Sequence, residues 1–454
     1  MPYVSLNPAT NQIIKTFSCW ENQRLCETLA LCHEDFLLWR ETGFDKRAEL
    51  MGRLSALLQH GRDKYAALIT QEMGKPINEA RAEVEKCALC CDYYAVHGAR
   101  FLADEGVKTD AGASHISYRP LGTVLGIMPW NFPFWQVYRF AVPALMAGNA
   151  CTLKHSSNVP QCALAIEELF RQAGFPQHLF VTLMIEANQV ADAIASPHVH
   201  AVTLTGSEPA GRKVAADAGR HLKKCVLELG GSDPFIVLED ADLEFATNHA
   251  VASRFLNCGQ SCIAAKRFIL MPQIADRFIE LFRQKVSALR IGDPNDTATQ
   301  IGPMARPDLL EELHRQVSDS IAQGAHAVIG CAPAGRTGAY YLPSILDHVT
   351  EKTRAYHEEV FGPVAALIRA TDEDDAIRIA NHSRYGLGAS IWTGDTARGE
   401  QLAKKIEAGS VFVNGMVKSD PRLPFGGVKS SGFGRELSYH GIREFVNTQA
   451  HWVR

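Results

Sequence analysis

The chain has 454 residues, of which 46% are hydrophobic and 21% are charged, and its formal net charge is −4. These values are typical of a globular protein with two or three domains, and they exclude an intrinsically disordered chain. The weak negative charge and the lack of a run rich in lysine and arginine argue against a nucleic-acid partner.

The N-terminal residues contain neither the basic stretch nor the apolar stretch of an export signal. The most apolar region, 126–150, is interrupted by Arg139 and by prolines. A membrane helix would need about 20 cleaner apolar residues, so we expect no membrane partner and a cytoplasmic location. The 12 cysteines form no short repeated framework, and most are expected to be reduced core residues.

Residues 21–100 are predicted to be helical, because apolar residues such as Leu50, Leu54 and Leu57 recur at helical spacing. Cys87 and Cys90 form a Cys-x-x-Cys within this pattern. No strand or glycine turn leads into the motif. One face of a buried helix is therefore favoured over a redox centre.

From about residue 115, short apolar strands and helices alternate. This alternation predicts mainly parallel sheets with crossover helices. In the first run the expected strands are 116–119, 122–127, 151–154, 199–204 and 224–229, and the expected helices are 161–172 and 211–219. A second run covers roughly 231–430, with strands at 268–271, 364–368 and 410–414 and helices at 275–289 and 309–323. The acidic run 372–375 is expected to begin a helix.

Two residues in glycine-rich turns carry candidate chemistry. Cys262 ends the segment Phe-Leu-Asn-Cys-Gly-Gln-Ser-Cys, and Glu228 lies in Leu-Glu-Leu-Gly-Gly. A polar turn exposes backbone N–H groups that favour a thiolate and hold an oxyanion. Such a pair suits attack of the thiolate on an electrophilic carbon, followed by activation of water by the carboxylate. The alternative for Cys262 is a small hydrophobic residue in the core.

Six motifs occur together along the chain. They are Pro-Trp-Asn-Phe-Pro at 129–133, Thr-Gly-Ser at 205–207, Glu-Leu-Gly-Gly at 228–231, Gly-Gln-Ser-Cys at 259–262, Glu-Val-Phe-Gly-Pro at 359–363, and Pro-Phe-Gly-Gly with Ser-Gly-Phe-Gly-Arg-Glu within 424–436. In this order and spacing the chain resembles the aldehyde dehydrogenase superfamily over essentially its full length. A single motif is weak evidence, whereas six in register are very specific.

The resemblance implies the roles of the catalytic residues. Cys262 would be the nucleophile that forms a thiohemiacetal, and Asn131 would donate its side-chain amide to the oxyanion. Glu228 would be the general base that activates water for thioester hydrolysis. Glu436 resembles a residue tied to proton relay, with a surface role as the alternative. Cys258 is expected to be buried, with redox pairing to the nucleophile as the alternative.

The resemblance also implies NAD or NADP as the cofactor. The Gly-x-Gly-x-x-Gly motif is absent, and the family instead places a helix N-terminus, which favours phosphate, after a strand. The implied cofactor-binding residues are Trp130, Lys154, Ser157, Gly206, Ser207, Gly211, Leu229, Glu359 and Phe361. Many family members have Lys-Pro-x-Glu where this chain has Lys-His-Ser-Ser at 154–157. Because Ser157 replaces a carboxylate that repels a 2′-phosphate, we expect NADP to bind as well as NAD.

Arg139 is a charge in an apolar run, which is costly unless it is paired. It is either in a buried ion pair with an internal Glu or Asp, or a clamp for a substrate carboxylate. Succinate semialdehyde dehydrogenases have an arginine at this offset and a serine where this chain has Ser419, six residues before Phe425. The resemblance to the shorter bacterial members of that group implies Arg139, Ser419 and Phe425 as substrate-binding residues.

The predicted function is therefore NAD(P)-dependent oxidation of succinate semialdehyde, or of a similar short carboxy-aldehyde. One alternative is a broad-specificity aliphatic or aromatic aldehyde dehydrogenase with a structural Arg139. A CoA-acylating enzyme fits less well, because that group lacks the glutamate present here as Glu228. A non-catalytic structural descendant of the family is a remote alternative.

The fold implied is α/β and aldehyde dehydrogenase-like. It has a Rossmann-type cofactor domain (1–101 and 121–230), an α/β catalytic domain (231–439) and a small β oligomerisation arm (102–120 and 440–454). The last strand is expected near Glu444 to Val453. A homodimer or homotetramer is expected, since the arm would pair its strand edge with a partner. No histidine spacing suggests a metal site.

Overall fold

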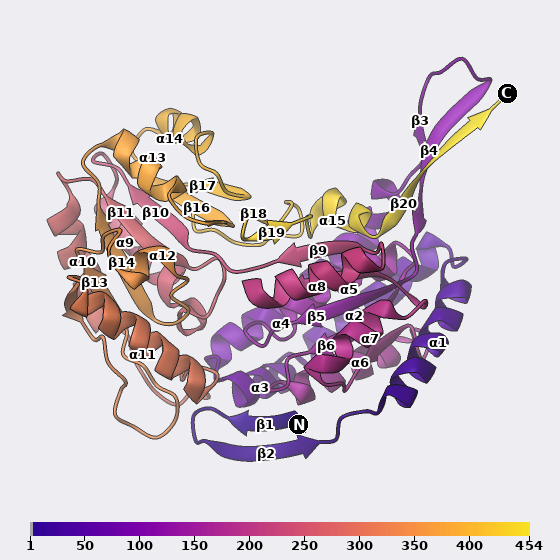
Figure 1. Cartoon of the computed structure of the whole chain (residues 1–454), viewed down its shortest axis with the longest axis horizontal. Coiled ribbons are helices and arrows are strands. Elements are labelled where there is room, and N and C mark those ends of the chain that lie inside the picture. The colour runs from indigo at the N-terminus through magenta and orange to yellow at the C-terminus, as the bar shows by residue number, and fades with distance from the viewer. Residues whose placement is uncertain (1–2) are drawn as a thin grey trace.

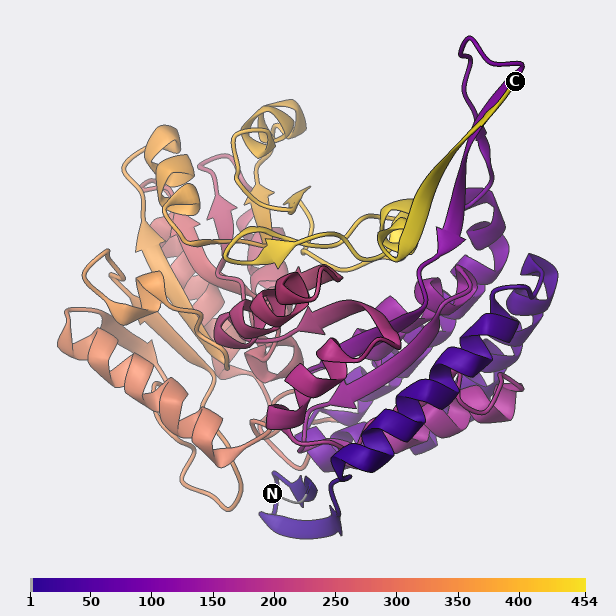
Figure 2. The ribbon, with the colours of Figure 1, turned by 45° about the vertical axis from the view of Figure 1, so that its right-hand side comes forward.

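The computed structural model describes residues 3–454 and shows two α/β lobes from which a thin arm projects (Figures 1 and 2). The first lobe is built on a six-stranded sheet. Its order is β19 (Gly432–Phe433), β9 (Lys224–Glu228), β8 (Val199–Thr205), β5 (Thr123–Met128), β6 (Ala150–His155) and β7 (Phe180–Thr182). All neighbouring strands are parallel except β19, which is antiparallel to β9.

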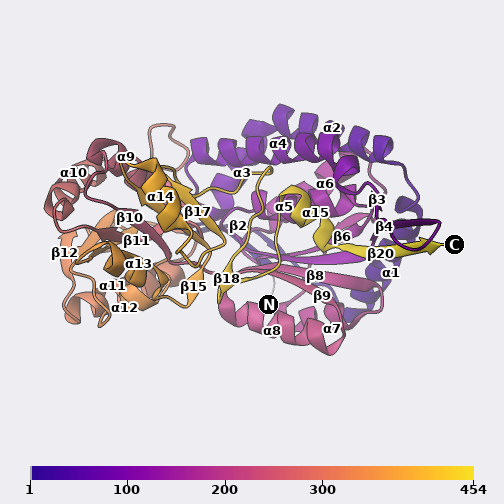
Figure 3. The same ribbon diagram turned by 90° about the horizontal axis from the view of Figure 1, so that it is seen from above.

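Helices cover both faces of this sheet (Figure 3). One face is covered by α2 (Phe44–His60), α3 (Arg62–Met73), α4 (Ile77–Phe101), α5 (Trp135–Met146) and α6 (Pro160–Ala173). The other carries α1 (Asn22–Trp39), α7 (Val190–Ala195) and α8 (Glu208–Arg220). The N-terminal hairpin consists of β1 (Tyr3–Asn7) and β2 (Gln12–Phe17).

The second lobe contains a seven-stranded sheet. Its order is β12 (His326–Ile329), β13 (Ser344–Asp347), β14 (Val364–Arg369), β11 (Ala265–Leu270), β10 (Asp233–Val237), β16 (Gly388–Trp392) and β17 (Ser410–Val413). Only β12 pairs in an antiparallel manner. Its helices are α9 (Leu243–Phe255), α10 (Ala275–Ser287), α11 (Pro307–Ala322), α12 (Arg354–His357), α13 (Glu373–Asn381) and α14 (Thr396–Ala403), and β15 (Tyr385–Gly386) pairs with β18 (Val428–Lys429).

The expected helices and strands are confirmed, with shifts of one or two residues at most ends. The strand expected at 116–119 is β4 (Ala113–Pro120), which belongs to the antiparallel arm and not to a parallel sheet. Asp372 is the N-cap of α13, and its side chain accepts the Asp375 N–H, as the acidic run predicts. Cys87 and Cys90 are fully buried on α4, which confirms the interpretation of that motif as a buried helix face.

The arm is an antiparallel sheet of β20 (Val446–Val453), β4 (Ala113–Pro120) and β3 (Glu105–Gly106). The last strand, expected near Glu444 to Val453, is confirmed, with its start two residues later at Val446, because Glu444 ends the helix α15 (Ser438–Glu444). The chain also returns to the first sheet at β19, before the predicted boundary at residue 439. The C-terminal segment therefore crosses from the second lobe over the first to reach the arm (Figure 1).

The strand order of the first sheet indicates which edge binds a ligand. β5 is buried almost throughout and lies at the centre, as expected for a parallel strand covered on both faces. A side chain at Gly126 would clash with Phe140 of α5, since an added Cβ would lie 2.2 Å from its ring. The chain runs from β5 to β6 on one side and later to β8 on the other. Ligands of such sheets bind at the carboxyl ends of the strands where this reversal occurs.

Candidate active site

The turn that presents Cys262 has an unusual backbone. Asn257, Cys258 and Gly259 have φ values of 54°, 54° and 71°, and non-glycine residues rarely adopt this left-handed region. Gly259 also lies against the chain at Gly362, because an added Cβ would be 2.2 Å from its carbonyl oxygen. The buried Arg254 guanidinium donates to the Gly259 and Gly362 carbonyls at 2.6 and 2.7 Å. The turn is therefore held from within the second lobe.

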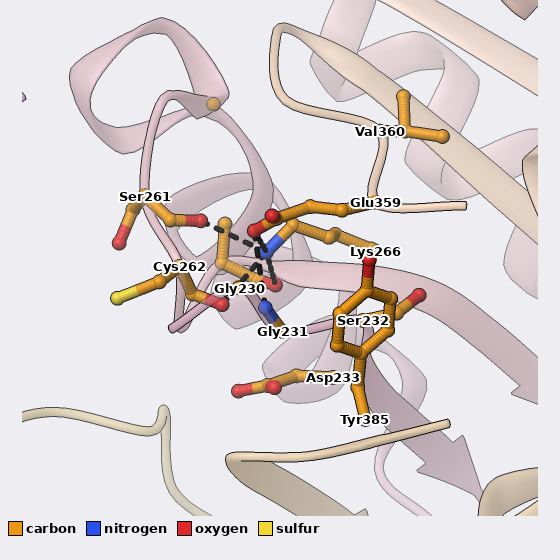
Figure 4. Close-up of polar contacts among 12 residues, drawn as sticks. Gly230, Gly231, Ser232, Asp233, Ser261, Cys262, Lys266, Glu359, Val360 and Tyr385 are labelled. Carbon is orange, nitrogen blue, oxygen red and sulfur yellow. Dashed lines mark hydrogen bonds and ion pairs between the residues drawn. The ribbon is translucent and has the colours of Figure 1, made fainter. Parts of the chain in front are cut away.

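Lys266 is a second buried cation that holds this turn, and sequence reasoning missed it (Figure 4). Its Nζ donates to the carbonyl oxygens of Ser261 at 2.9 Å and Cys262 at 2.7 Å. The same atom lies 3.3 Å from Oε1 of Glu359, which also accepts the Gly231 N–H at 3.1 Å. Lys266 thus links the nucleophile loop to the segment that carries Glu359.

We predict that Lys266→Met lowers kcat/KM for all aldehydes by about 10²-fold, the cost of a displacement of roughly 1 Å at a reacting group. Without the ammonium group, the Ser261 and Cys262 carbonyls and the Glu359 carboxylate lose a buried partner. Steady-state kinetics with two unrelated aldehydes would measure the effect. Lys285→Met, which removes a partly exposed lysine paired with Glu244 on α9, is the control. Unchanged kinetics in Lys266→Met would contradict this role.

Asn131 and Glu228 both come from the carboxyl ends of first-lobe strands. Asn131 follows β5, and its Nδ2 donates to the Gln260 carbonyl at 3.1 Å, while its Oδ1 has no hydrogen-bond partner among residues 3–454. Asn257 Nδ2 in turn donates to the Asn131 carbonyl at 2.8 Å. Glu228 ends β9 and is 2% exposed. The structure thus brings Asn131 into contact with the nucleophile loop.

The two cysteines of the loop have different surroundings. Burial raises the pKa of the Cys262 thiol to about 12, although the charges of Arg139 and Lys266 act against that rise. The resting residue is therefore a neutral thiol, and a base must take its proton when it attacks. Cys258 is 1% exposed, and its sulfur accepts the Gly302 N–H at 3.1 Å. These contacts favour the buried interpretation of Cys258.

A cluster of buried charges lies next to Glu228. Arg139 forms an ion pair with Glu436, donates to the Thr205 hydroxyl at 3.2 Å and lies over the Phe425 ring at 4.5 Å. The ion pair is the first of the two alternatives expected for Arg139. Burial, and then repulsion from Glu436, raise the pKa of Glu228 well above its usual value, while Arg139 opposes the rise. Glu228 therefore holds its proton more tightly than an exposed glutamate does, and it becomes a base when it loses that proton.

A cavity of about 160 Å³ opens beside Cys262. Cys262 shares its lining with the three predicted substrate residues, Arg139, Ser419 and Phe425. Lys86 of α4 and Trp135 of α5 also line the cavity, and neither was singled out from the sequence. The remaining walls include apolar side chains such as Phe132 and Met416. The arrangement fits a small molecule with one reactive carbon near Cys262.

Other predicted residues gather at the carboxyl edge of the first sheet. Lys154 is the penultimate residue of β6, and the exposed Ser157 follows that strand. Gly206 and Ser207 follow β8, and Ser207 is the N-cap of α8 without a side-chain hydrogen bond to the helix. The Ser207 side chain therefore leaves the first N–H groups of α8 free of a cap. A phosphate site at a helix N-terminus requires such uncapped N–H groups.

The remaining cofactor candidates border both lobes. Trp130 and Phe361 make an edge-to-face contact with ring centroids 5.8 Å apart. Leu229 is buried under α8, where Gly211 allows close approach, because an added Cβ would lie 2.6 Å from the leucine side chain. Glu359 is held by Lys266 and by the Gly231 N–H. These residues connect the sheet edge to the cavity at Cys262.

Within residues 3–454, no group of three or more His, Cys, Asp or Glu side chains is placed to hold a metal ion. No helix in the same part of the chain combines the length and the apolar character needed to cross a bilayer.

Comparison with known proteins identifies the family. The sequence profile of the aldehyde dehydrogenase family matches residues 2–451. This chain belongs to the aldehyde dehydrogenase family. It is 50% identical over 453 residues, covering 100% of both chains, to a probable NADP(+) succinate-semialdehyde dehydrogenase of Synechocystis sp.. It is 48% identical to a NAD(P)+ succinate semialdehyde dehydrogenase of Escherichia coli (strain K12), covering 99% of this chain and 97% of the relative.

Two solved structures share this fold. The succinic semialdehyde dehydrogenase from Streptococcus pyogenes in complex with NADP+ is similar with a TM-score of 0.98, at 37% identity and 99% coverage of both chains. The structure of Gox0499 is similar with a TM-score of 0.99, at 40% identity and 100% coverage of both chains. The α/β aldehyde dehydrogenase fold expected from the sequence is confirmed.

Proposed function

We propose that this aldehyde dehydrogenase oxidises succinate semialdehyde, or a similar short carboxy-aldehyde, to the acid with NAD or NADP. The observation that carries the proposal is the cavity in which Cys262 shares walls with cationic and hydroxyl side chains. The relatives named for this activity, similar over essentially the whole chain, support it. Steady-state rates with succinate semialdehyde, hexanal and aminobutyraldehyde test it. A preference for hexanal would favour the broad-specificity alternative.

The reaction assigned to the side chains has two stages. The Cys262 sulfur attacks the aldehyde carbon and forms a thiohemiacetal, its thiol proton passing to solvent in the cavity, while Asn131 Nδ2 and the Cys262 N–H stabilise the oxyanion. Oxidation of that carbon leaves a thioester on Cys262. Glu228 then removes a proton from water, which attacks the thioester carbon and releases the acid and the free thiol. Because burial and Glu436 raise the pKa of Glu228, the base form and the hydrolysis rate increase as the pH rises.

The edge of the first sheet suits the cofactor. The uncapped N-terminus of α8 would take the pyrophosphate. The Lys154 ammonium, which lies 5.8 Å from the centroid of the Tyr3 ring, would bind the adenosine ribose, and Glu359 the nicotinamide ribose. Trp130, Phe361, Gly206, Gly211 and Leu229 would shape the surrounding walls. When bound, the nicotinamide accepts the hydride that leaves the substrate carbon.

We predict that Ser157→Glu raises KM for NADP by at least about tenfold and leaves KM for NAD little changed, because a new carboxylate repels the 2′-phosphate. Ser157 is exposed after β6, so the substitution needs no repacking. KM for both cofactors at fixed aldehyde concentration checks the prediction, with Ser157→Gln as the uncharged control. Equal changes for both cofactors would contradict it.

We also propose a division into three domains and an oligomeric assembly. The cofactor domain would comprise 1–101 and 121–230, the catalytic domain 231–439, and the arm 102–120 with 440–454. The paired strands β4 and β20 leave an edge that a partner subunit could extend. We expect a homodimer or homotetramer in the cytoplasm, and light scattering on the purified protein would determine the assembly.

A further inference from the structure

The strongest unassigned feature of the molecule is Lys86, a lysine in the wall of the cavity beside Cys262. It lies on α4, half-buried, with its Nζ 2.8 Å from the Ser419 hydroxyl oxygen and 4.3 Å from the centroid of the Trp135 ring. Within residues 3–454, no carboxylate lies within ion-pair distance of it. A buried cation is costly unless an anion pairs with it. Because the protein supplies no anion to Lys86, a ligand in the cavity would have to supply it.

Neighbouring charges are already neutralised. Arg139 is paired with Glu436. Glu83, one turn before Lys86 on α4, is paired with Lys75, and its Oε1 accepts the N–H groups of Phe134 and Trp135 at 2.9 and 3.0 Å. Arg139 is therefore compensated by Glu436, whereas Lys86, which is held by Ser419 and Trp135, has no carboxylate partner among the described residues. Lys418, the third cation of the cavity lining, is exposed.

The Ser419 hydroxyl is oriented by its partners. Its oxygen accepts from Lys86 Nζ at 2.8 Å and from Trp135 Nε1 at 2.9 Å. A hydroxyl has two acceptor lone pairs and one donor hydrogen. Because both lone pairs are occupied, the hydroxyl hydrogen of Ser419 is left to donate a hydrogen bond. Ser419 lines the cavity, so this hydrogen can be donated to a ligand there. Lys86 likewise keeps N–H donors beyond the one given to Ser419.

We infer that Lys86 and the Ser419 hydroxyl together bind the carboxylate of an ω-carboxy aldehyde whose aldehyde carbon lies at Cys262. This rests on the proposed function and changes its substrate site: Lys86 carries the net charge, and Arg139 with Glu436 forms a neutral wall. Trp135 positions the pair, because it donates to Ser419 and packs under the ammonium group.

The charge of Lys86 depends on pH near neutrality. Burial lowers the pKa of Lys86 to about 8, with Arg139 adding to the effect and Cys87, Cys90 and Glu83 opposing it. Lys86 is therefore charged below about pH 8 and loses its charge as the pH rises above that value. From the other elements around the cavity, Lys418 and Cys262 face the same space.

The test compares succinate semialdehyde with butanal, a neutral aldehyde with the same number of carbons. Both substrates share the chemical steps at Cys262 and Glu228. The effects of these steps on rate therefore drop out of the ratio of the two kcat/KM values. We expect the wild-type ratio to fall above about pH 8. We expect Lys86→Met to lower it by about 30-fold or more, as for loss of one partner of a buried charge pair, and to leave kcat/KM for butanal within a few-fold. Lys86→Arg should keep the ratio and remove its fall with pH.

The outcomes separate the inference from the proposed function. A wild-type enzyme without preference for succinate semialdehyde would overturn the proposed function itself. A preference that persists in Lys86→Met, or a ratio independent of pH in the wild type, would overturn the role of Lys86 alone. If Lys86→Met does not fold, the pH profile of the wild type and of Lys86→Arg still decides the question.

Discussion

Replacing Cys262 with alanine is expected to abolish aldehyde oxidation, with a loss of at least about 10⁴-fold, the scale seen when a covalent nucleophile is removed. Cys262 is the only cysteine lining the described cavity, and the loop around it is fixed by Arg254 and Lys266. Without the sulfur, neither the thiohemiacetal nor the thioester can form. The rate of NADP reduction by purified protein measures the effect.

The matched control is Cys258→Ala in the same turn. Cys258 is buried in the core of the second lobe, and among the described residues its sulfur hydrogen-bonds with the backbone of Gly302, so its loss should affect stability more than chemistry. Retention of more than about a tenth of the activity by Cys262→Ala would show that another group attacks the aldehyde. Thermal unfolding of both variants distinguishes lost chemistry from lost folding.

Glu228→Gln is expected to separate the two stages of the reaction. The amide has the same shape but cannot take a proton from water, so hydrolysis of the thioester should slow by about 10²–10⁴-fold. Oxidation of the first substrate molecule does not need this base for water. Stopped-flow measurement should therefore show a burst of about one reduced cofactor per active site, followed by slow turnover.

The surroundings of Glu228 sharpen this expectation. Burial and repulsion from Glu436 raise the pKa of Glu228, whereas the amide of the variant has no carboxyl proton to lose. In the wild type, the steady-state rate should rise with pH, whereas the slow phase of Glu228→Gln should lose that dependence. A variant with neither burst nor turnover would indicate that Glu228 acts before oxidation, as the base for the Cys262 thiol.

Much of the fold could be predicted from local patterns. The alternation of apolar strands and helices in 115–229 follows from the side-chain periodicities of the two structures, and the observed sheet matches it. The short helix α15 (Ser438–Glu444) was not predicted, because this segment has no clear apolar period. The pairing of β19 with β9 joins residues about 200 positions apart, which no local pattern reveals.

The site residues that lie in sequence motifs were predicted, whereas those that reach the site only through tertiary contacts were missed. Cys262, Glu228 and Asn131 lie in recognisable segments. Lys86 follows Glu85 in a charged helical stretch, which reads as a solvated face. A weak signal for Lys266 existed, since it is a charge within the apolar run that follows Cys262, and such charges are costly unless paired. For Arg139, the partner Glu436 could not be chosen from sequence among the many acidic residues.

The most direct test of the account is the mass of the enzyme after a single turnover. Glu228→Gln is mixed with succinate semialdehyde and NADP, quenched in acid and analysed as the intact protein and as the peptide that contains Cys262. The account predicts one succinyl group bound to Cys262 in near-stoichiometric amount, and none in Glu228→Gln that also carries Cys262→Ala. Reduced cofactor without an acyl group on Cys262, or an acyl group on another residue, would contradict it.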